Sequence, residues 1–254
     1  MIRAERLAKI TEYVQTKRYA SIDELVNAMD VSKATIRRDL NTLSSEEKVL
    51  LTRGGATWNS DEKTGELAYN EKRLTNASDK MILGEQASKL IKDNMAVIVS
   101  AGTTTRALTP YLNTFNGVNI VTNDIAIASD LVSYDGISVT LTGGQLRKNF
   151  YTVRGYAAEE LISKMKTDIA FIGLESLDVT SGGYISNMDE VVLIECIIKA
   201  SEKLVVMCDQ SKFENNAFIQ VCELSDIDFV ITNKEINKKY IKALEDMGIT
   251  VLLA

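Results

Sequence analysis

The residues best suited to bind a ligand are two adjacent arginines, Arg37 and Arg38, which follow a helix-capping serine, Ser32. At about 100° per residue, a helix through them has one apolar face, made of Ile36, Leu40 and Leu43. Arg38 and Asn41 then point outward, and Arg37 lies on the flank. Guanidinium and amide groups on the exposed side of a helix bind phosphates and base edges of DNA. A solvated amphipathic helix is the alternative when the arginine pair is considered alone.

A second group of candidate binding residues follows the short β-branched runs of the C-terminal part. Glycines, hydroxyls, an amide, a carboxylate and one lysine stand at the ends of four of these runs or shortly after them, at Gly102, Thr103, Thr104, Thr122, Asn123, Gly143, Gly144, Asp209 and Lys212. Ligands collect where the carboxyl ends of parallel strands meet. Backbone N–H groups before a helix and a lysine suit an anion, so a phosphorylated sugar fits best. The Gly-Thr turn alone is also typical of a simple helix cap.

The composition excludes several other classes of site. The chain has no histidine, which removes histidine general bases, Ser-His triads and His-ligated metals. Its three cysteines, Cys196, Cys208 and Cys222, lack the spacing of a zinc knuckle and stand among apolar residues. No strand is followed by a dinucleotide-binding glycine pattern or a Walker A loop. We therefore expect no metal and no cofactor.

Charge is distributed unequally along the chain. The net charge is −6, but residues 1–58 contain 10 Lys and Arg against 8 Asp and Glu. A basic module on an acidic body is typical of site-specific DNA binding rather than coating. No apolar run approaches the ~20 residues that span a bilayer, and the N-terminus has no signal-peptide core. We expect a cytoplasmic protein without a membrane partner.

Helical patterns surround the arginines. Apolar residues at helical spacing predict a first helix over residues 3–16. Ser21 and Glu24 have the spacing of a capping box and open a second helix, which ends a tight turn before Ser32. Two short helices joined in this way, the second with the arginines, are typical of a helix-turn-helix.

A hairpin is predicted after the arginine helix. The apolar run 49–51, the glycine pair 54–55 and a return strand indicate a β-hairpin wing with Arg53 near its tip, although a generic loop is the alternative. The candidate DNA-binding residues of this module are Ser32, Lys33, Thr35, Arg37, Arg38, Asn41 and Arg53.

The rest of the chain alternates apolar strands with helices. After a helix over roughly residues 79–92, the strands lie near residues 97–99, 119–122, 139–141, 169–172, 204–207, 229–231 and 250–252. This alternation indicates a mainly parallel sheet covered on both faces. The predicted organisation is α/β: a small winged helix-turn-helix domain at 1–58, a polar linker at 59–75 and a larger α/β domain at 76–254.

Both parts of the chain resemble the DeoR family of bacterial transcriptional regulators. The N-terminal resemblance lies in Glu5-Arg6, Ser32, the run from Thr35 to Leu40, Leu43 and Gly54-Gly55-Ala56. The C-terminal part is similar to the family's sugar-phosphate sensor, which is related in fold to ribose-5-phosphate isomerase. The matching residues are Gly102-Thr103-Thr104, Val121-Thr122-Asn123, Thr142 to Arg147, Phe171-Ile172-Gly173, Glu190, Asp209 and Ser211-Lys212-Phe213.

This resemblance implies a sequence-specific repressor of a carbohydrate-metabolism operon that a phosphorylated sugar releases from double-stranded operator DNA. It adds Glu190 to the effector-binding candidates. A homodimer or homotetramer is expected, because a single winged module binds DNA weakly. An activator would use the same DNA-binding chemistry.

Two features depart from the family pattern. Residues 45–48 lack the glycine that commonly precedes the wing, and Leu51 and Arg53 replace the usual arginine and histidine. Ile194-Glu195 stands where many members carry a basic pair. If that helix faces the effector, the replacement changes which effector is accepted; if it lies outside the pocket, it does not.

An enzyme is the main alternative to a regulator. A sugar-phosphate isomerase with a DNA-binding arm would need a carboxylate base, for which Glu175, Asp178 and Glu190 are candidates. The isomerase-type Asp-Gly-Ala-Asp run is absent, and Gly173-Leu174-Glu175-Ser176 occupies the comparable strand end. We therefore expect no enzyme. A purely structural protein would leave both groups of binding residues unexplained.

Overall fold

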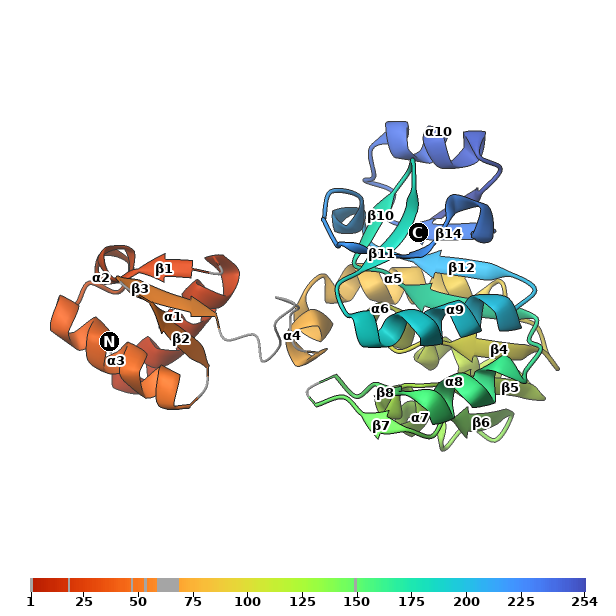
Figure 1. Ribbon diagram of the computed structural model, residues 1–254, viewed down its shortest axis with the longest axis horizontal. Coiled ribbons are helices and arrows are strands. Elements are labelled where there is room, and N and C mark those ends of the chain that lie inside the picture. Colours follow the sequence, from red (N-terminus) through yellow and green to blue (C-terminus); the bar gives the residue numbers. More distant parts are fainter. Residues whose placement is uncertain (1, 18, 47, 53, 59–68, 149) are drawn as a thin grey trace. The chain divides into compact units, whose positions relative to one another are not determined.

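The chain forms two compact units, residues 1–63 and 64–254 (Figure 1). The computed structural model describes residues 2–17, 19–46, 48–52, 54–58, 69–148 and 150–254. Arg53 and residues 59–68 of the expected linker lie outside the described residues. None of the helices in the described ranges is long and apolar enough to cross a membrane.

The N-terminal unit is a winged helix-turn-helix, as predicted. Its helices are α1 (Arg3–Lys17), α2 (Ile22–Met29) and α3 (Lys33–Ser45), and its strands are β1 (Tyr19–Ser21), β2 (Val49–Thr52) and β3 (Gly55–Trp58). Ser21 caps α2 in the predicted capping box with Glu24. The three helices and the wing close over one small apolar core that includes Ile10, Leu25, Ile36, Leu40 and Leu43.

The short strand β1 is the element of this unit that the sequence pattern misses. It pairs antiparallel with β3, which makes the sheet order β1-β3-β2. The backbones approach closely at Gly55, where an added Cβ would lie 2.2 Å from the carbonyl oxygen of Ala20. A glycine is therefore required at this position of the wing.

The C-terminal unit is built on the predicted parallel sheet, with the strand order β15-β14-β12-β9-β4-β5-β6. All neighbouring strands in it run parallel. The strands are β4 (Ala96–Val99), β5 (Val118–Thr122), β6 (Ile137–Leu141), β9 (Ile169–Gly173), β12 (Leu204–Met207), β14 (Phe229–Thr232) and β15 (Thr250–Leu253).

Helices cover both faces of this sheet (Figure 1). Alternate strand residues face opposite sides, so that Val97 and Val99 belong to one apolar core and Ile98 to the other. The first core packs against α5 (Ala77–Ser88) and α7 (Ile125–Leu131). The second packs against α8 (Tyr156–Ser163), α9 (Val191–Ala200) and α10 (Lys238–Asp246).

Smaller elements cluster around the sheet. They are the hairpin β7 (Gln145–Leu146) and β8 (Val153–Arg154), the short helices α4 (Tyr69–Leu74) and α6 (Thr103–Arg106), the small sheet β10 (Ser176–Asp178), β11 (Gly182–Ile185) and β13 (Ile219–Cys222), and the 3-10 helices η1 (Thr109–Thr114), η2 (Met188–Glu190), η3 (Gln210–Phe213) and η4 (Leu224–Asp226).

Helix α4 lies inside the range 59–75 that was expected to be a linker. Its Tyr69 is buried, and the Tyr69 ring lies 5.0 Å from that of Tyr151 between centroids. Because α4 packs onto the C-terminal unit, the polar segment before it is shorter than the expected linker. The sequence did not predict this packing, because α4 is mostly polar and a single buried aromatic residue, Tyr69, anchors it.

Candidate functional site

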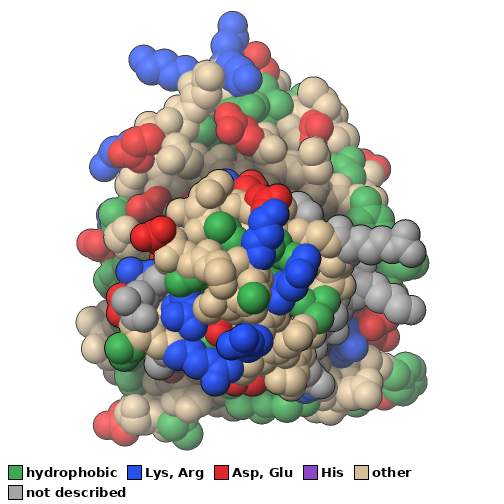
Figure 2. All heavy atoms as spheres, turned by 90° about the vertical axis from the view of Figure 1, so that its left-hand side faces the viewer, with side chains coloured by type: hydrophobic (Ala, Val, Ile, Leu, Met, Phe, Trp, Pro, Cys, Tyr) green, Lys and Arg blue, Asp and Glu red, His purple; other side chains and the backbone are tan. Residues whose placement is uncertain are grey.

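The arginine helix α3 presents the predicted face to solvent. Ser32 caps it by accepting a hydrogen bond from the backbone N–H of Thr35, and the hydroxyls of these two residues lie 3.0 Å apart. Arg37, Arg38 and Asn41 are exposed. Lys and Arg side chains gather on the face of the N-terminal unit that Figure 2 turns to the viewer. This surface has the charge and donor groups that DNA phosphates and base edges require.

Two of the candidate DNA-binding residues also have partners within the unit. The ammonium of Lys33 lies 2.6 Å from a carboxylate oxygen of Asp23 in an exposed ion pair. Thr35 bonds to Ser32, so these two hydroxyls define the start of the helix. Such exposed pairs exchange readily with water and do not prevent contact with a phosphate.

The wing forms without the glycine that is missing from residues 45–48. The backbone N–H of Lys48 donates to the carbonyl of Leu43, at 2.8 Å, and this bond leads the chain from α3 into β2. Gly54, with φ +104°, lies at the hairpin turn. The departure from the family pattern therefore leaves the hairpin in place, while the predicted role of Arg53 at its tip lies outside the described residues.

In the C-terminal unit, the loops after β4 and β5 are tied together at the carboxyl edge of the sheet. The carboxamide oxygen of Asn123 accepts a hydrogen bond from the N–H of Ala101, at 2.8 Å, and Asp124 accepts one from Gly102. Thr122 is fully buried, and its hydroxyl accepts from the N–H of Asp124. Asn123 and Thr122 thus shape the loop that carries Gly102.

A buried lysine lies beside this loop. Lys80 of α5 is only 6% exposed, and its ammonium donates to the hydroxyl of Thr103, at 3.0 Å, and to the carbonyl of Lys72 in α4. Burial lowers the pKa of Lys80 to about 8; Asp209 opposes this shift, and the positive charges of Lys212 and Lys72 add to it. Lys80 and Thr103 are therefore in direct contact beside the loop that carries Gly102, within the electrostatic influence of Lys72 and Lys212.

The sequence analysis missed Lys72 and Lys80. Lys72 lies within the expected linker, and Lys80 within a helix that is predicted from its apolar residues. One signal was present: Lys80 shares the buried face of α5 with Leu83, Gly84 and Ala87, at positions i+3, i+4 and i+7. A lysine within an otherwise buried stripe indicates a partner or a function.

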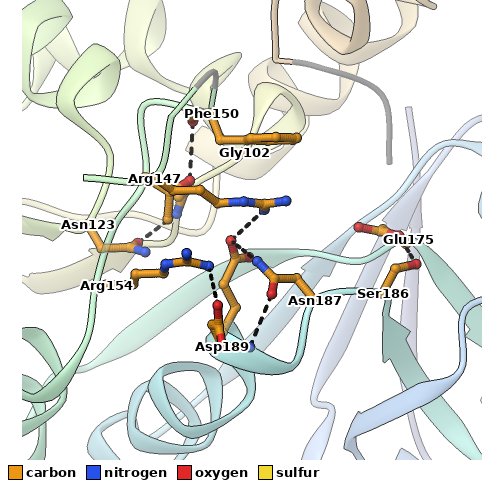
Figure 3. Close-up of polar contacts among 12 residues, drawn as sticks. Gly102, Asn123, Arg147, Phe150, Arg154, Glu175, Ser186, Asn187 and Asp189 are labelled. Carbon is orange, nitrogen blue, oxygen red and sulfur yellow. Dashed lines mark hydrogen bonds and ion pairs between the residues drawn. The ribbon is translucent and has the colours of Figure 1, made fainter. Parts of the chain in front are cut away.

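A second polar group lies at the same edge, around Arg147 (Figure 3). The guanidinium of Arg147 is buried, lies 3.5 Å from the centre of the Phe150 ring, and is 2.7 Å from a carboxylate oxygen of Glu190. Asn187 also donates to Glu190, at 3.3 Å. Glu190, a predicted effector-binding residue, is therefore held by an arginine and an amide.

Glu175 is held in a similar way. It accepts a hydrogen bond from the hydroxyl of Ser186, and the ammonium of Lys72 lies 3.6 Å from its other carboxylate oxygen. Figure 3 places Glu175 and Ser186 facing each other beside the Arg147 group. Lys72 therefore links α4 to the turn after β9, and its ammonium lies 5.9 Å from the centre of the Phe150 ring.

The remaining predicted effector-binding residues line the same edge with local roles. Gly144 has φ +131°, and an added Cβ would lie 2.5 Å from the carbonyl oxygen of Arg154, whereas a Cβ added at Gly143 would meet open space. Asp209 caps η3 by accepting from the N–H of Ser211, at 2.9 Å. Lys212 is half-buried, and Thr104 is buried.

The replaced basic pair does not lie together at this site. Ile194 is buried in the apolar core between the sheet and its helices, and Glu195 is exposed beside Lys199. The side chain at position 194 therefore packs the fold. Among the residues that the structure describes, no group of three His, Cys, Asp or Glu side chains could hold a metal ion.

Comparisons with known proteins match both units. Residues 6–62 match the DeoR-like helix-turn-helix domain, and residues 75–234 match the DeoR C terminal sensor domain. The HTH-type transcriptional regulator GlpR of Haloferax volcanii is 31% identical over 99% of this chain and 98% of its own length. The HTH-type transcriptional repressor GlcR of Bacillus subtilis is 28% identical over 100% and 97%.

Two further proteins show the range of similarity. The glycerol-3-phosphate regulon repressor of Escherichia coli is 29% identical over 92% of each chain. Among solved structures, ribose 5-phosphate isomerase A of Methanocaldococcus jannaschii is 17% identical, with a TM-score of 0.41 over 55% of each chain.

Proposed function

This chain belongs to the DeoR family of HTH-type transcriptional regulators, and from that premise we propose that it is a repressor of a carbohydrate-metabolism operon. It binds double-stranded operator DNA through α3 and is released when a phosphorylated sugar binds at the carboxyl edge of the parallel sheet. The effector must then bind the free protein more tightly than the DNA-bound one.

The exposed face of α3 supports the DNA-binding half of this proposal. Arg37 and Arg38 supply phosphate or guanine contacts, and Asn41 and Lys33 supply further donors. Ser32 and Thr35 fix the start of the helix that carries these side chains. Arg53 is proposed as a contact of the wing.

The buried ammonium of Lys80 is the observation that carries the effector half. Placing a lysine in a nearly water-free position costs free energy unless an anion or several acceptors compensate. Here Lys72 and Lys212 add positive charge, and Thr103 adds a hydroxyl. A phosphate group would neutralise these charges, while Asn123, Gly143 and Glu190 suit the hydroxyls of the sugar.

The state of the carboxylates supports a binding site over an isomerase site. An enediol mechanism needs a free carboxylate base above the sugar. Glu190 is held by Arg147 and Asn187, and Glu175 by Lys72 and Ser186. Hydrogen bonds from Thr180 and Ser181 lower the pKa of Asp178, which makes that carboxylate a weaker base.

We also propose that the protein acts as a homodimer or homotetramer on repeated half-sites. One winged module buries a modest surface on DNA, whereas two modules on one face of the duplex combine their affinities. Analytical ultracentrifugation of the free protein tests this, and a monomer at micromolar concentration that binds one half-site tightly would contradict it.

A thermal-shift screen tests the effector proposal. The protein is heated with a panel of sugar phosphates and with the corresponding free sugars. We expect stabilisation by at least one phosphorylated compound and none by its free sugar, because the lysines bind the phosphate. Stabilisation by free sugars alone would overturn the phosphate assignment. Turnover of a phosphopentose or phosphohexose by the purified protein would favour the isomerase.

A further inference from the structure

A buried carboxylate lies on the helix that faces DNA. Asp39 directly follows the exposed Arg38, yet Asp39 is only 1% exposed. Its two oxygens accept hydrogen bonds from the guanidinium of Arg6 in α1, at 2.6 and 3.4 Å. A buried carboxylate without a cation is strongly disfavoured, so this pair fixes α1 against α3. Asp39 is too enclosed to contact DNA itself.

A second arginine of α1 extends along the same helix. The Nε of Arg3 lies 3.6 Å from Asp39, and its Nη2 donates to the hydroxyl of Thr42, at 2.9 Å. That hydroxyl in turn donates to the backbone carbonyl of Arg38, at 3.1 Å. Arg3 therefore reaches the flank of α3, one turn from the arginine that is proposed to bind DNA.

Arg3 is placed for an external ligand, unlike Arg6. Its side chain is 62% exposed, whereas that of Arg6 is 12% exposed. A guanidinium has five N–H donors, and the bond to Thr42 uses one of them. Its Nε lies beside Asp39, and the rest of this largely exposed group is open to a ligand. Figure 2 shows other Lys and Arg side chains on the face of the N-terminal unit that is turned to the viewer. A fixed, exposed guanidinium beside a recognition helix suits a backbone phosphate.

We propose that Arg3 is a further phosphate-contacting residue and that Asp39 is the positioning residue that holds it there. The contact adds to those proposed for Arg37 and Arg38, and it lies outside the recognition helix. Asp39 acts by tying both arginines of α1 to α3. The inference rests on the proposed binding of DNA by α3 and is independent of the effector.

The Arg3 contact is tested by measuring DNA affinity as a function of salt. Arg3→Ala is compared with Lys9→Ala. Lys9 is an exposed cation of the same helix, and it pairs with Glu5. Each phosphate contact contributes about 0.9 to the slope of log affinity against log salt. We expect Arg3→Ala to reduce that slope by about one unit, for operator and unrelated DNA alike.

The control variant separates a specific contact from general loss of charge. Lys9→Ala is expected to leave the slope unchanged, and Arg38→Ala to reduce the preference for operator over unrelated DNA. A slope for Arg3→Ala that equals the wild-type slope would overturn the contact, as would an equal loss in Lys9→Ala. These results do not depend on whether Arg38 reads bases.

The positioning role of Asp39 is tested by Asp39→Asn. Removing a negative charge near DNA would by itself strengthen binding, so weaker binding reports lost positioning. We expect Asp39→Asn to lower both the DNA affinity and the salt slope. The double variant Asp39→Asn with Arg3→Ala is expected to bind DNA no more weakly than the weaker of the two single variants. Additive losses, or stronger binding by folded Asp39→Asn, would overturn the role. If Asp39→Asn does not fold, Arg6→Lys weakens the same clamp and is measured instead.

Discussion

The pH dependence of effector binding follows from the state of Lys80. Burial lowers the pKa of this lysine to about 8, so its charge changes within an accessible range. The chain has no histidine, and burial raises the pKa of the Cys222 thiol to about 12 and also raises that of Cys208. A phosphate monoester has its second pKa at about 6 and stays a dianion above pH 7. Lys80 is thus the group expected to control the profile.

The magnitude follows from the protonated fraction of Lys80. With a pKa of about 8, the charged fraction falls from about 0.9 at pH 7 to about 0.1 at pH 9. If only the charged ammonium attracts the phosphate, the apparent Kd rises about tenfold over this range. The sign is that of a cation: the contribution of Lys80 is nearly complete at pH 7 and is lost as the pH rises through about 8. Burial raises the pKa of Asp124 to about 6, so this carboxylate also changes its charge below pH 7. The titrations are therefore kept at pH 7 and above.

Isothermal titration calorimetry measures this effect. The sugar phosphate that gives the largest thermal shift is titrated at pH 7, 8 and 9, in two buffers of different ionisation enthalpy. We expect proton uptake on binding near pH 8, because the bound phosphate restores the charge of Lys80. Lys80→Met is the matched variant, with weaker affinity and a flat profile. A flat wild-type profile, or an unchanged profile in Lys80→Met, would refute the reasoning.

Three further predictions concern single residues. Arg38→Ala is expected to weaken operator binding about 10- to 100-fold, as loss of one bidentate contact does, with an unchanged thermal shift by the effector; a gel-shift titration measures this. Lys212→Ala is expected to bind operator normally but to resist release by the effector, and full inducibility would remove Lys212 from the site. Phe171→Ala, in the centre of the sheet, is expected to cost about 3–5 kcal/mol in urea denaturation.

Local sequence signals predicted most of the fold. The capping residues Ser21 and Ser32 and the helical spacing of apolar residues predicted α2 and α3, and each β-branched run became a strand of the parallel sheet. These signals act over a few residues, so one chain suffices to read them. The strand β1 was not predicted, because its three residues show no strand pattern of their own. They form a strand only by pairing with β3.

The candidate ligand site was predicted only where it coincides with strand ends. Strand ends identify the edge of the sheet, but the order β9-β4-β5 decides which loops meet there. Lys80 and Lys72 enter through helix packing that no local pattern records. The sequence motif includes Arg147 but gives no sign of its contact with Glu190, which joins positions far apart in the sequence.

Operator release by a phosphorylated sugar is the most direct test of the central claim. Fluorescence anisotropy follows labelled operator DNA bound to the full chain while a sugar phosphate or its free sugar is added. The account predicts that the phosphorylated compound lowers anisotropy to the free-DNA value, that the free sugar has no effect, and that Lys80→Met needs far more effector. Operator that stays bound in the presence of every sugar phosphate that stabilises the protein would contradict it.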